Sequence, residues 1–220
     1  MSDGLLAWTP VAAVFDVDGL LVDTEPSWTL AETELFARRG LPFGDEEKAL
    51  LIGRGLREAC DGLAVTFDEP GRGAALAMEL LGLVEEALGA GAEAMRGAHR
   101  LVGAVAERIP VAVASNSPRV LMTAALRRGG FADRFPVALC ADDVVAVKPD
   151  PEMYLAACAT LGASPTDCVA FEDSRSGVRA ARAAGLRCVG VPTLTHVELD
   201  ADFVVPALDD AVLVGWAEGW

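Results

Sequence analysis

Apolar and polar positions follow two different patterns along the chain. One apolar run near the N-terminus, and several after residue 97, have the length of buried strands and are separated by stretches with helical spacing. The predicted strands are residues 11–15, 111–114, 137–140, 168–171, 188–191 and 203–205. The first run contains no polar residue, which is typical of a strand covered on both faces of a parallel sheet. Strands that alternate with helices predict an α/β fold with a Rossmann-like, doubly wound parallel sheet.

Residues 24–96 show helical spacing interrupted by glycine-containing breaks, and we predict no strand there. Residues 28–35 place apolar side chains with the period of a helix. Further helices are expected at residues 45–51, 56–63 and 74–88. We therefore predict an all-helical domain, residues 24–96, inserted into an α/β core formed by residues 1–23 and 97–220.

Helix boundary signals separate the strands of the core. Ser117 followed by Pro118 resembles an N-cap with proline at the first helical position, and it predicts a helix that stops at residues 129–130. The other helices expected in the core are residues 101–109, 150–162, 174–184 and 207–214. Such helices supply the crossovers that parallel strands need.

Charge and composition narrow the classes of partner. The chain has 220 residues and a formal net charge of −15, which argues against nucleic acid and anionic membranes as partners. A small phosphorylated substrate needs only local positive charge and stays possible. No apolar run is long enough to span a bilayer, and residues 1–10 lack the features of a signal peptide. Five cysteines without a C-x-x-C pair indicate neither a disulfide framework nor a zinc site. We expect a cytoplasmic protein that is a monomer or a weak homodimer.

Two aspartates stand directly after the first apolar run. Asp16 and Asp18 repel each other unless a cation holds them, and Mg²⁺ prefers such oxygen ligands. One metal-bound carboxylate can attack an electrophile while the other moves protons. Two alternatives stay open for this stretch: a turn with solvated aspartates, and a calcium loop, although Gly19 follows too closely for an EF-hand.

Polar residues also follow three other predicted strands. Ser115 and Asn116 come after the second strand, and Lys148 lies in the loop after the third. Glu172 and Asp173 come after the fourth. Each has an ordinary explanation alone, as a turn, a surface lysine or a helix cap. Because the carboxyl ends of parallel strands meet at one edge, together they predict one site equipped for phosphoryl transfer.

Four motifs make the chain similar to the haloacid dehalogenase superfamily, in the subgroup that contains β-phosphoglucomutase and small sugar-phosphate phosphatases. They are residues 16–25 (DVDGLLVDTE), 114–117 (ASNS), 147–154 (VKPDPEMY) and 171–177 (FEDSRSG). The resemblance implies that residues 24–96 form the helical cap of this subgroup. It also implies a small phosphorylated substrate and Mg²⁺ as cofactor.

The resemblance further implies catalytic and metal-binding roles. Asp16 would be the nucleophile that forms an aspartyl-phosphate. Asp18 would be the general acid and base, with its backbone carbonyl at the metal, and Lys148 would orient and neutralise. Asp173 would ligate Mg²⁺ together with Asp16, and Glu172 would ligate it directly or through water.

Substrate contacts and departures from the family pattern bear on the reaction. Ser115 and Asn116 would bind the transferring phosphoryl group. Arg54 lies in a segment that resembles the specificity loop, where it either contacts the distal part of the substrate or is an exposed arginine. The mutase subgroup has a histidine where Trp28 stands here, and a lysine soon after the serine, where this chain has Arg119. These departures favour a hydrolase over a mutase. We expect a Mg²⁺-dependent phosphatase that hydrolyses a small phosphorylated metabolite, of the sugar-phosphate class, through an aspartyl-phosphate.

Two alternative functions stay open. The first is a hexose-phosphate mutase of the β-phosphoglucomutase type. The second is a non-catalytic binding protein with the same fold. The intact acidic residues and the lysine of the motifs argue against it. A dehalogenase is disfavoured because Asp18 is present, and the phosphonate-cleaving branch is disfavoured because the predicted cap contains a single lysine, Lys48.

Overall fold

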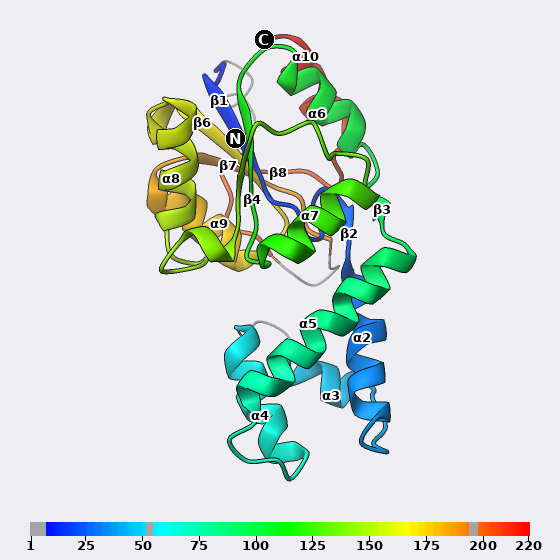
Figure 1. Cartoon of the computed structure of the whole chain (residues 1–220). Helices are drawn as coiled ribbons and strands as arrows, with labels where there is room; N and C mark the ends of the chain where they lie inside the picture. The colour runs from blue at the N-terminus through cyan, green and yellow to red at the C-terminus, as the bar shows by residue number, and fades with distance from the viewer. Residues whose placement is uncertain (1–7, 52–54, 194–197) are drawn as a thin grey trace. The chain divides into compact units, whose positions relative to one another are not determined.

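The computed structural model describes residues 8–51, 55–193 and 198–220, which belong to two compact units (Figure 1). The α/β unit comprises Met1–Asp23 and Glu93–Trp220, and the helical unit comprises Thr24–Ala92. None of the helices in the described ranges has the length and apolar character needed to cross a membrane.

Six parallel strands form the sheet of the α/β unit. In spatial order they are β5 (Val137–Leu139), β4 (Val111–Ala114), β1 (Ala12–Phe15), β6 (Cys168–Glu172), β7 (Arg187–Gly190) and β8 (Phe203–Val204). Numbered along the chain, this order corresponds to the 3-2-1-4-5-6 arrangement of doubly wound sheets. The predicted fold class is therefore confirmed. The winding reverses at β1, so the carboxyl ends of β1, β4 and β6 form the edge where such sheets bind ligands.

Helices cover both faces of this sheet (Figure 1). They are α8 (Glu152–Leu161) and α9 (Arg175–Ala184) on one face, and α6 (Ala98–Ala106), α7 (Arg119–Arg128) and α10 (Ala211–Glu218) on the other. Strand residues alternate between the two layers. Ala12 and Val14 pack into the cluster formed with α8 and α9. Phe15 belongs to the other layer and stacks on Phe171, with ring centroids 4.6 Å apart.

The described part of the helical unit contains helices and no strand. The helices are α2 (Glu25–Ala37), α3 (Asp45–Ala49), α4 (Leu56–Thr66) and α5 (Gly73–Ala90). Their facing sides bury Leu35, Leu63 and Leu76 almost completely. The all-helical character predicted for this part of the chain is confirmed.

The prediction of no strand in residues 24–96 was wrong at the end of this range. Glu93–Ala94 form β3, which pairs antiparallel with β2 (Val22–Asp23), and two-residue strands carry no periodic signal. The last helix begins at Ala211 rather than at residue 207. The carboxylate of Asp210 accepts hydrogen bonds from two backbone N–H groups of the first turn, and this cap determines the start of the helix.

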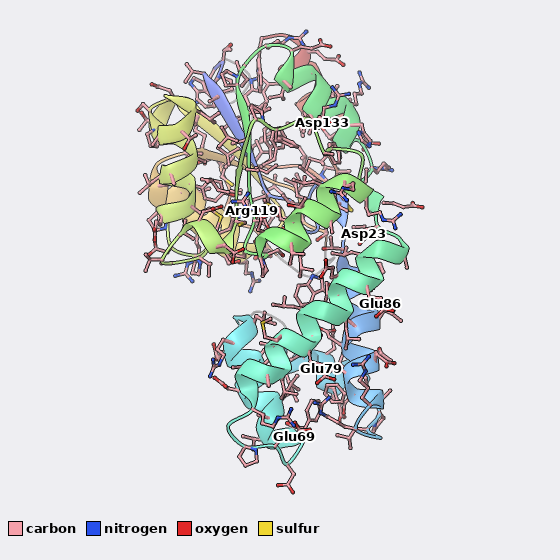
Figure 2. The ribbon with its side chains drawn as sticks, viewed as in Figure 1. Asp23, Glu69, Glu79, Glu86, Arg119 and Asp133 are labelled. Atoms are coloured by element: carbon pink, nitrogen blue, oxygen red, sulfur yellow. The ribbon has the colours of Figure 1, made fainter. Side chains whose placement is uncertain are left out.

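An ion-pair network inside the helical unit joins the turn after α2 to α5 and to the loop that precedes α5, near Glu69 and Glu79 (Figure 2). Arg39 Nη2 lies 2.9 Å from Glu79 Oε2, and Arg39 Nε lies 2.9 Å from Glu69 Oε1. The hydrogen bond from Arg39 holds the pKa of Glu79 below its usual value of 4.5. The network therefore stabilises the fold most when Glu79 is ionised.

The effect of Glu79→Gln on stability is expected to depend on pH. Because the folded-state pKa of Glu79 is depressed, its contribution is present above about pH 4.5 and is lost as pH falls through the folded pKa. Urea denaturation near pH 7 should show the variant less stable by up to about 1 kcal/mol. This difference should shrink steadily as pH falls below 4.5. The control is Glu85→Gln, an exposed α5 residue with no ion pair among the described residues. A pH-independent difference would contradict the prediction.

Candidate active site

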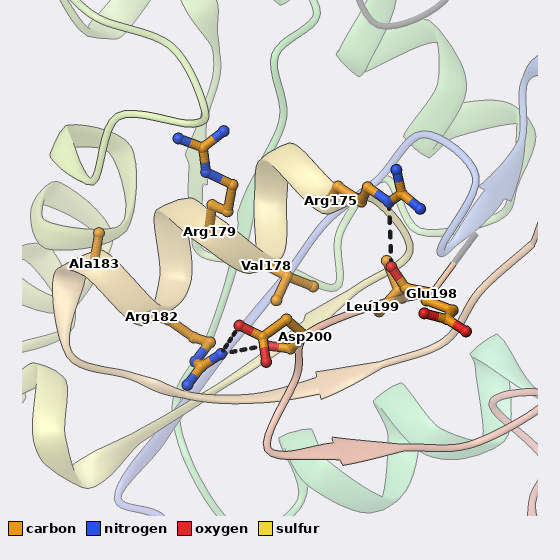
Figure 3. A pocket seen from close by; sticks show the side chains of 8 residues that line it. All are labelled: Arg175, Val178, Arg179, Arg182, Ala183, Glu198, Leu199 and Asp200. Carbon is orange, nitrogen blue, oxygen red and sulfur yellow. Dashed lines mark hydrogen bonds and ion pairs between the residues drawn. The ribbon is translucent and has the colours of Figure 1, made fainter.

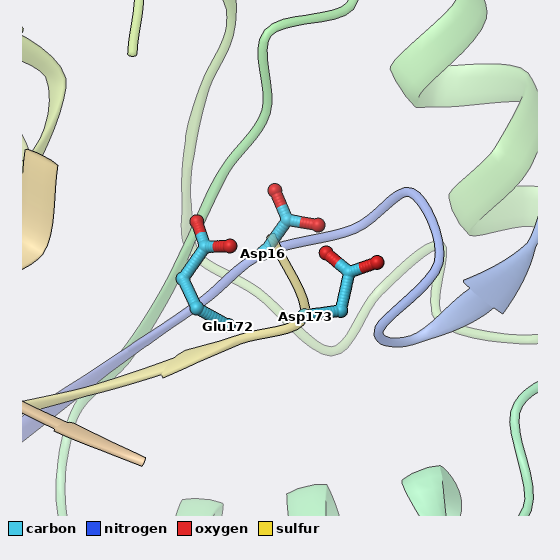
Figure 4. A group of neighbouring side chains, drawn as sticks. All are labelled: Asp16, Glu172 and Asp173. Carbon is cyan, nitrogen blue, oxygen red and sulfur yellow. The ribbon is translucent and has the colours of Figure 1, made fainter. Parts of the chain in front are cut away.

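Three carboxylates meet at the carboxyl ends of β1 and β6. Asp16 directly follows β1, Glu172 is the last residue of β6, and Asp173 is the next residue. Oxygens of all three lie within 4.8 Å of one another (Figure 4). The structure thus brings together three of the four residues for which metal binding was predicted from the sequence.

Lys148 lies at the base of this cluster and is buried. Its Nζ donates to Asp16 Oδ1 at 2.6 Å, to Glu172 Oε1 at 2.6 Å and to the carbonyl oxygen of Ala114 at 2.7 Å. Burial alone lowers the pKa of the ammonium group, but the two carboxylates raise it overall above its usual value. Burial raises the pKa of Asp16 well above its usual value, the positive charge of Lys148 opposes this rise, and the neighbouring carboxylates add to it. Lys148 is therefore a fixed positive charge that stabilises the ionised form of Asp16.

The carboxylate of Glu172 is held by protein groups at both oxygens. Oε1 accepts a second hydrogen bond, from the hydroxyl of Tyr154 at 2.6 Å, and Oε2 accepts one from Ser174 Oγ at 3.1 Å. Gly177 leaves room for this arrangement, because a Cβ there would overlap the carboxylate. Tyr154 was part of a motif in the sequence, but no role was predicted for it.

Asp18 belongs to the same edge of the sheet, but its side chain binds different partners. Its Oδ2 accepts hydrogen bonds from Ser115 Oγ at 2.8 Å and from Ser117 Oγ at 2.9 Å. The prediction that Ser117 caps the following helix was wrong: α7 begins at Arg119, with Pro118 at the cap position. Ser117 is thus a residue of the site that the sequence misassigned.

The side chain of Asn116 supports Lys148 by hydrogen bonding to the backbone of that lysine. Its Nδ2 donates to the backbone carbonyl of Lys148 at 3.0 Å, and its Oδ1 accepts from the backbone N–H of Lys148 at 2.9 Å. The side-chain amide therefore fixes the loop that carries the lysine. Binding of a phosphoryl group by Asn116 stays a prediction, as does the role of Arg54, which lies outside the described residues.

The acidic cluster fits a divalent cation. Burial, and then the negative charge of Glu172, raise the pKa of Asp173 to about 7. Asp16, Asp18 and Glu172 add further acidic groups, and Lys148 is the basic side chain in contact with two of them. A cluster of oxygen donors with an excess of negative charge is a suitable environment for Mg²⁺.

A separate cavity of about 890 Å³ lies along α9 (Figure 3). Its lining includes three arginines, but two of them already bind residues 198–200 of the same chain. Arg175 Nε donates to the carbonyl oxygen of Glu198 at 3.2 Å, and Arg182 pairs with Asp200. None of the carboxylates described above lines this cavity, and we assign it no part in the chemistry.

Comparisons with known proteins agree with this site. The sequence model of the haloacid dehalogenase-like hydrolases matches residues 11–185. The chain is 33% identical over 210 residues to the validoxylamine A 7'-phosphate phosphatase of Streptomyces hygroscopicus subsp. limoneus, covering 93% of this chain and 95% of that protein. It is 32% identical over 184 residues to the fructose-1-phosphate phosphatase YqaB of Escherichia coli, covering 82% of this chain and 96% of that protein.

A solved structure shows the same fold. CbbY from Rhodobacter sphaeroides, in complex with phosphate, superimposes with a TM-score of 0.80 at 28% identity, covering 92% of this chain and 96% of that chain. The chain belongs to the haloacid dehalogenase-like hydrolases, which confirms the family resemblance. Within that family it is a phosphoric monoester hydrolase, as predicted.

Proposed function

We propose that the protein is a Mg²⁺-dependent phosphatase that hydrolyses a small sugar phosphate through an aspartyl-phosphate on Asp16. The observation that carries this proposal is the buried contact of 2.6 Å between Lys148 Nζ and Asp16 Oδ1, beside the other carboxylates. A carboxylate paired with a fixed ammonium group, at the ligand-binding edge of the sheet, is suited to nucleophilic attack.

The proposed reaction has two steps. Asp16 attacks phosphorus, the bond to the leaving oxygen breaks, and Asp18 gives that oxygen a proton. Asp18 then takes a proton from the water that attacks phosphorus, which releases phosphate and restores the Asp16 carboxylate. Ser115 and Ser117 hold Asp18 through hydrogen bonds of 2.8 and 2.9 Å. Lys148 neutralises charge throughout.

Bound Mg²⁺ would offset negative charge on the phosphoryl oxygens. Asp16, Asp173 and the backbone carbonyl of Asp18 would hold it. Glu172 would contribute directly or through water. Contact through water suits Glu172 better, since both of its oxygens already accept hydrogen bonds.

Two of the relatives support the proposed substrate class. They are named as phosphatases of validoxylamine A 7'-phosphate and of fructose 1-phosphate. We propose that residues 24–96 act as the cap domain that selects the substrate, with Arg54 as a contact to its distal part. We also propose a cytoplasmic monomer or weak homodimer that binds neither nucleic acid nor membrane. The net charge of −15 and the five buried free cysteines support this environment.

The test is phosphate release from a panel of phosphorylated metabolites, with and without Mg²⁺, with Asp16→Asn beside the wild type. The proposal expects Mg²⁺-dependent release by the wild type and loss of about 10³-fold or more in the variant. If β-glucose 1-phosphate becomes glucose 6-phosphate without phosphate release, the mutase alternative is correct. If neither reaction occurs, binding of the panel compounds tests the non-catalytic alternative.

Gly19→Ala is expected to lower turnover at least about tenfold and to raise the Mg²⁺ concentration needed for half activation. Gly19 has a φ of +82°, and a Cβ there would overlap Asp173 Oδ2 and displace a proposed metal ligand. Gly40→Ala is the matched control, because its φ is +68° but a Cβ there meets nothing within 4 Å. Both variants carry similar backbone strain, so equal effects on Mg²⁺ activation would contradict the prediction.

A further inference from the structure

Tyr154 contacts the catalytic lysine and its carboxylate partner from inside the core. It lies on α8 and is completely buried. Its hydroxyl is 2.6 Å from Glu172 Oε1, the same oxygen that accepts from Lys148 Nζ. The ring of Tyr154 also lies beside the ammonium group, with Nζ 5.2 Å from the ring centroid. One side chain thus contacts both members of the pair behind Asp16.

We propose that Tyr154 is a positioning residue, which acts through Glu172 and Lys148 to keep the ammonium group on Asp16. The proposal rests on the proposed function, in which Asp16 is the nucleophile. The structure shows Tyr154 bonded to Glu172 and not to Asp16, so its effect on the reaction is indirect.

The hydrogen-bond pattern around Lys148 explains why one hydroxyl matters. A lysine ammonium group has three N–H donors. Here three acceptors surround it: Asp16 Oδ1, Glu172 Oε1 and the carbonyl oxygen of Ala114. The ammonium group therefore has one favoured orientation, which holds only while each acceptor keeps its place.

Glu172 Oε1 is the acceptor on which Tyr154 acts. Its carboxylate is fixed at Oε2 by Ser174 and at Oε1 by Tyr154. Without the hydroxyl, Glu172 keeps its charge but can turn about its last torsion, which is a soft one. Lys148 then loses its single orientation toward Asp16.

The experiment compares Tyr154→Phe with the wild type, using p-nitrophenyl phosphate as the probe. The substitution keeps the ring and removes only the hydroxyl. We expect kcat to fall about five- to tenfold with KM unchanged, because Tyr154 is argued to act on the groups around Asp16 and not on substrate binding. Thr160→Val is the matched control, since it removes from α8 a hydroxyl whose one hydrogen bond among the described residues goes to the carbonyl oxygen of Ala156.

A double-mutant cycle with Glu172→Ala tests the route of the effect, because alanine leaves the Tyr154 hydroxyl without this acceptor. If Tyr154 acts through Glu172, adding Tyr154→Phe to Glu172→Ala causes no further loss of kcat. Fully additive losses would overturn the proposal, as would an unchanged kcat in Tyr154→Phe or a change confined to KM or to Mg²⁺ activation. Melting curves establish that each variant is folded at the assay temperature. Asp16→Asn is measured in parallel, because retained turnover there refutes the proposed function independently of Tyr154.

Discussion

Asp18→Asn is expected to give an enzyme that is phosphorylated once and then stops. In the proposed reaction, Asp18 protonates the leaving oxygen in the first step and activates water in the second. p-Nitrophenolate leaves without needing a proton, so phosphorylation of Asp16 survives the substitution. Hydrolysis does not survive, because asparagine cannot accept the proton of water. Steady-state turnover should therefore fall about 10²- to 10⁴-fold.

The measurement is a rapid-mixing assay with p-nitrophenyl phosphate. Asp18→Asn should release a burst of about one p-nitrophenolate per enzyme molecule, as expected for covalent catalysis. Mass spectrometry should then find one phosphoryl group on Asp16. Asp16→Asn is the control that should show neither burst nor modification. Steady turnover by Asp18→Asn at the wild-type rate, without phosphorylated protein, would exclude the two-step role of Asp18.

Ser117→Ala tests how much the orientation of the Asp18 carboxylate contributes to turnover, apart from its ability to transfer protons. It removes one of the two hydroxyls that donate to Asp18 Oδ2, while Ser115 keeps its contact of 2.8 Å. The carboxylate remains able to transfer protons. Turnover should fall by less than about tenfold, and no phosphorylated enzyme should accumulate. Accumulation comparable to that in Asp18→Asn would show that the hydroxyl itself takes part in hydrolysis.

The sheet and the order of its polar residues could be predicted because they depend on local sequence. A buried parallel strand is a short, uninterrupted apolar run, and the residue that ends the run marks the carboxyl end of the strand. The register of β1 and β6 agrees with this rule. Phe15 lies opposite Phe171, and Asp16 and Glu172 are the residues that follow them. The position of the acids at one edge therefore follows from the pattern together with the topology of doubly wound sheets.

The contacts between side chains could not be predicted in the same way. Ser117 has the local sequence of a helix cap, but its hydroxyl bonds to Asp18, 99 positions earlier in the chain. Tyr154 has the spacing of a buried helical residue, and its bond to Glu172 depends on how α8 packs on the sheet. Local sequence propensity cannot predict such contacts, because tertiary packing determines them.

Lys148→Met is expected to lower both stability and turnover. The substitution removes the charge partner of Asp16 and Glu172 and leaves two buried carboxylates without it. Breaking a buried ion pair on one side costs about 3–5 kcal/mol, so urea denaturation without Mg²⁺ should show a loss of this order. Because burial raises the pKa of Asp16, this carboxylate takes up a proton as pH falls, and the difference from wild type should shrink. Turnover should fall at least about 10³-fold.

Lys48→Met provides the matched control, because Lys48 is also an ion-paired lysine but belongs to the helical unit. Its Nζ lies 2.6 Å from Glu32 Oε2 and 2.8 Å from Glu25 Oε1. Burial raises the pKa of Glu32, which shows that this pair too is partly removed from water. We expect Lys48→Met to lose stability while keeping turnover within about threefold of wild type, since it leaves Asp16 and its partners untouched. Equal losses of turnover in the two variants would mean that Lys148 contributes only to folding, and the electrostatic role proposed for it at Asp16 would then be wrong.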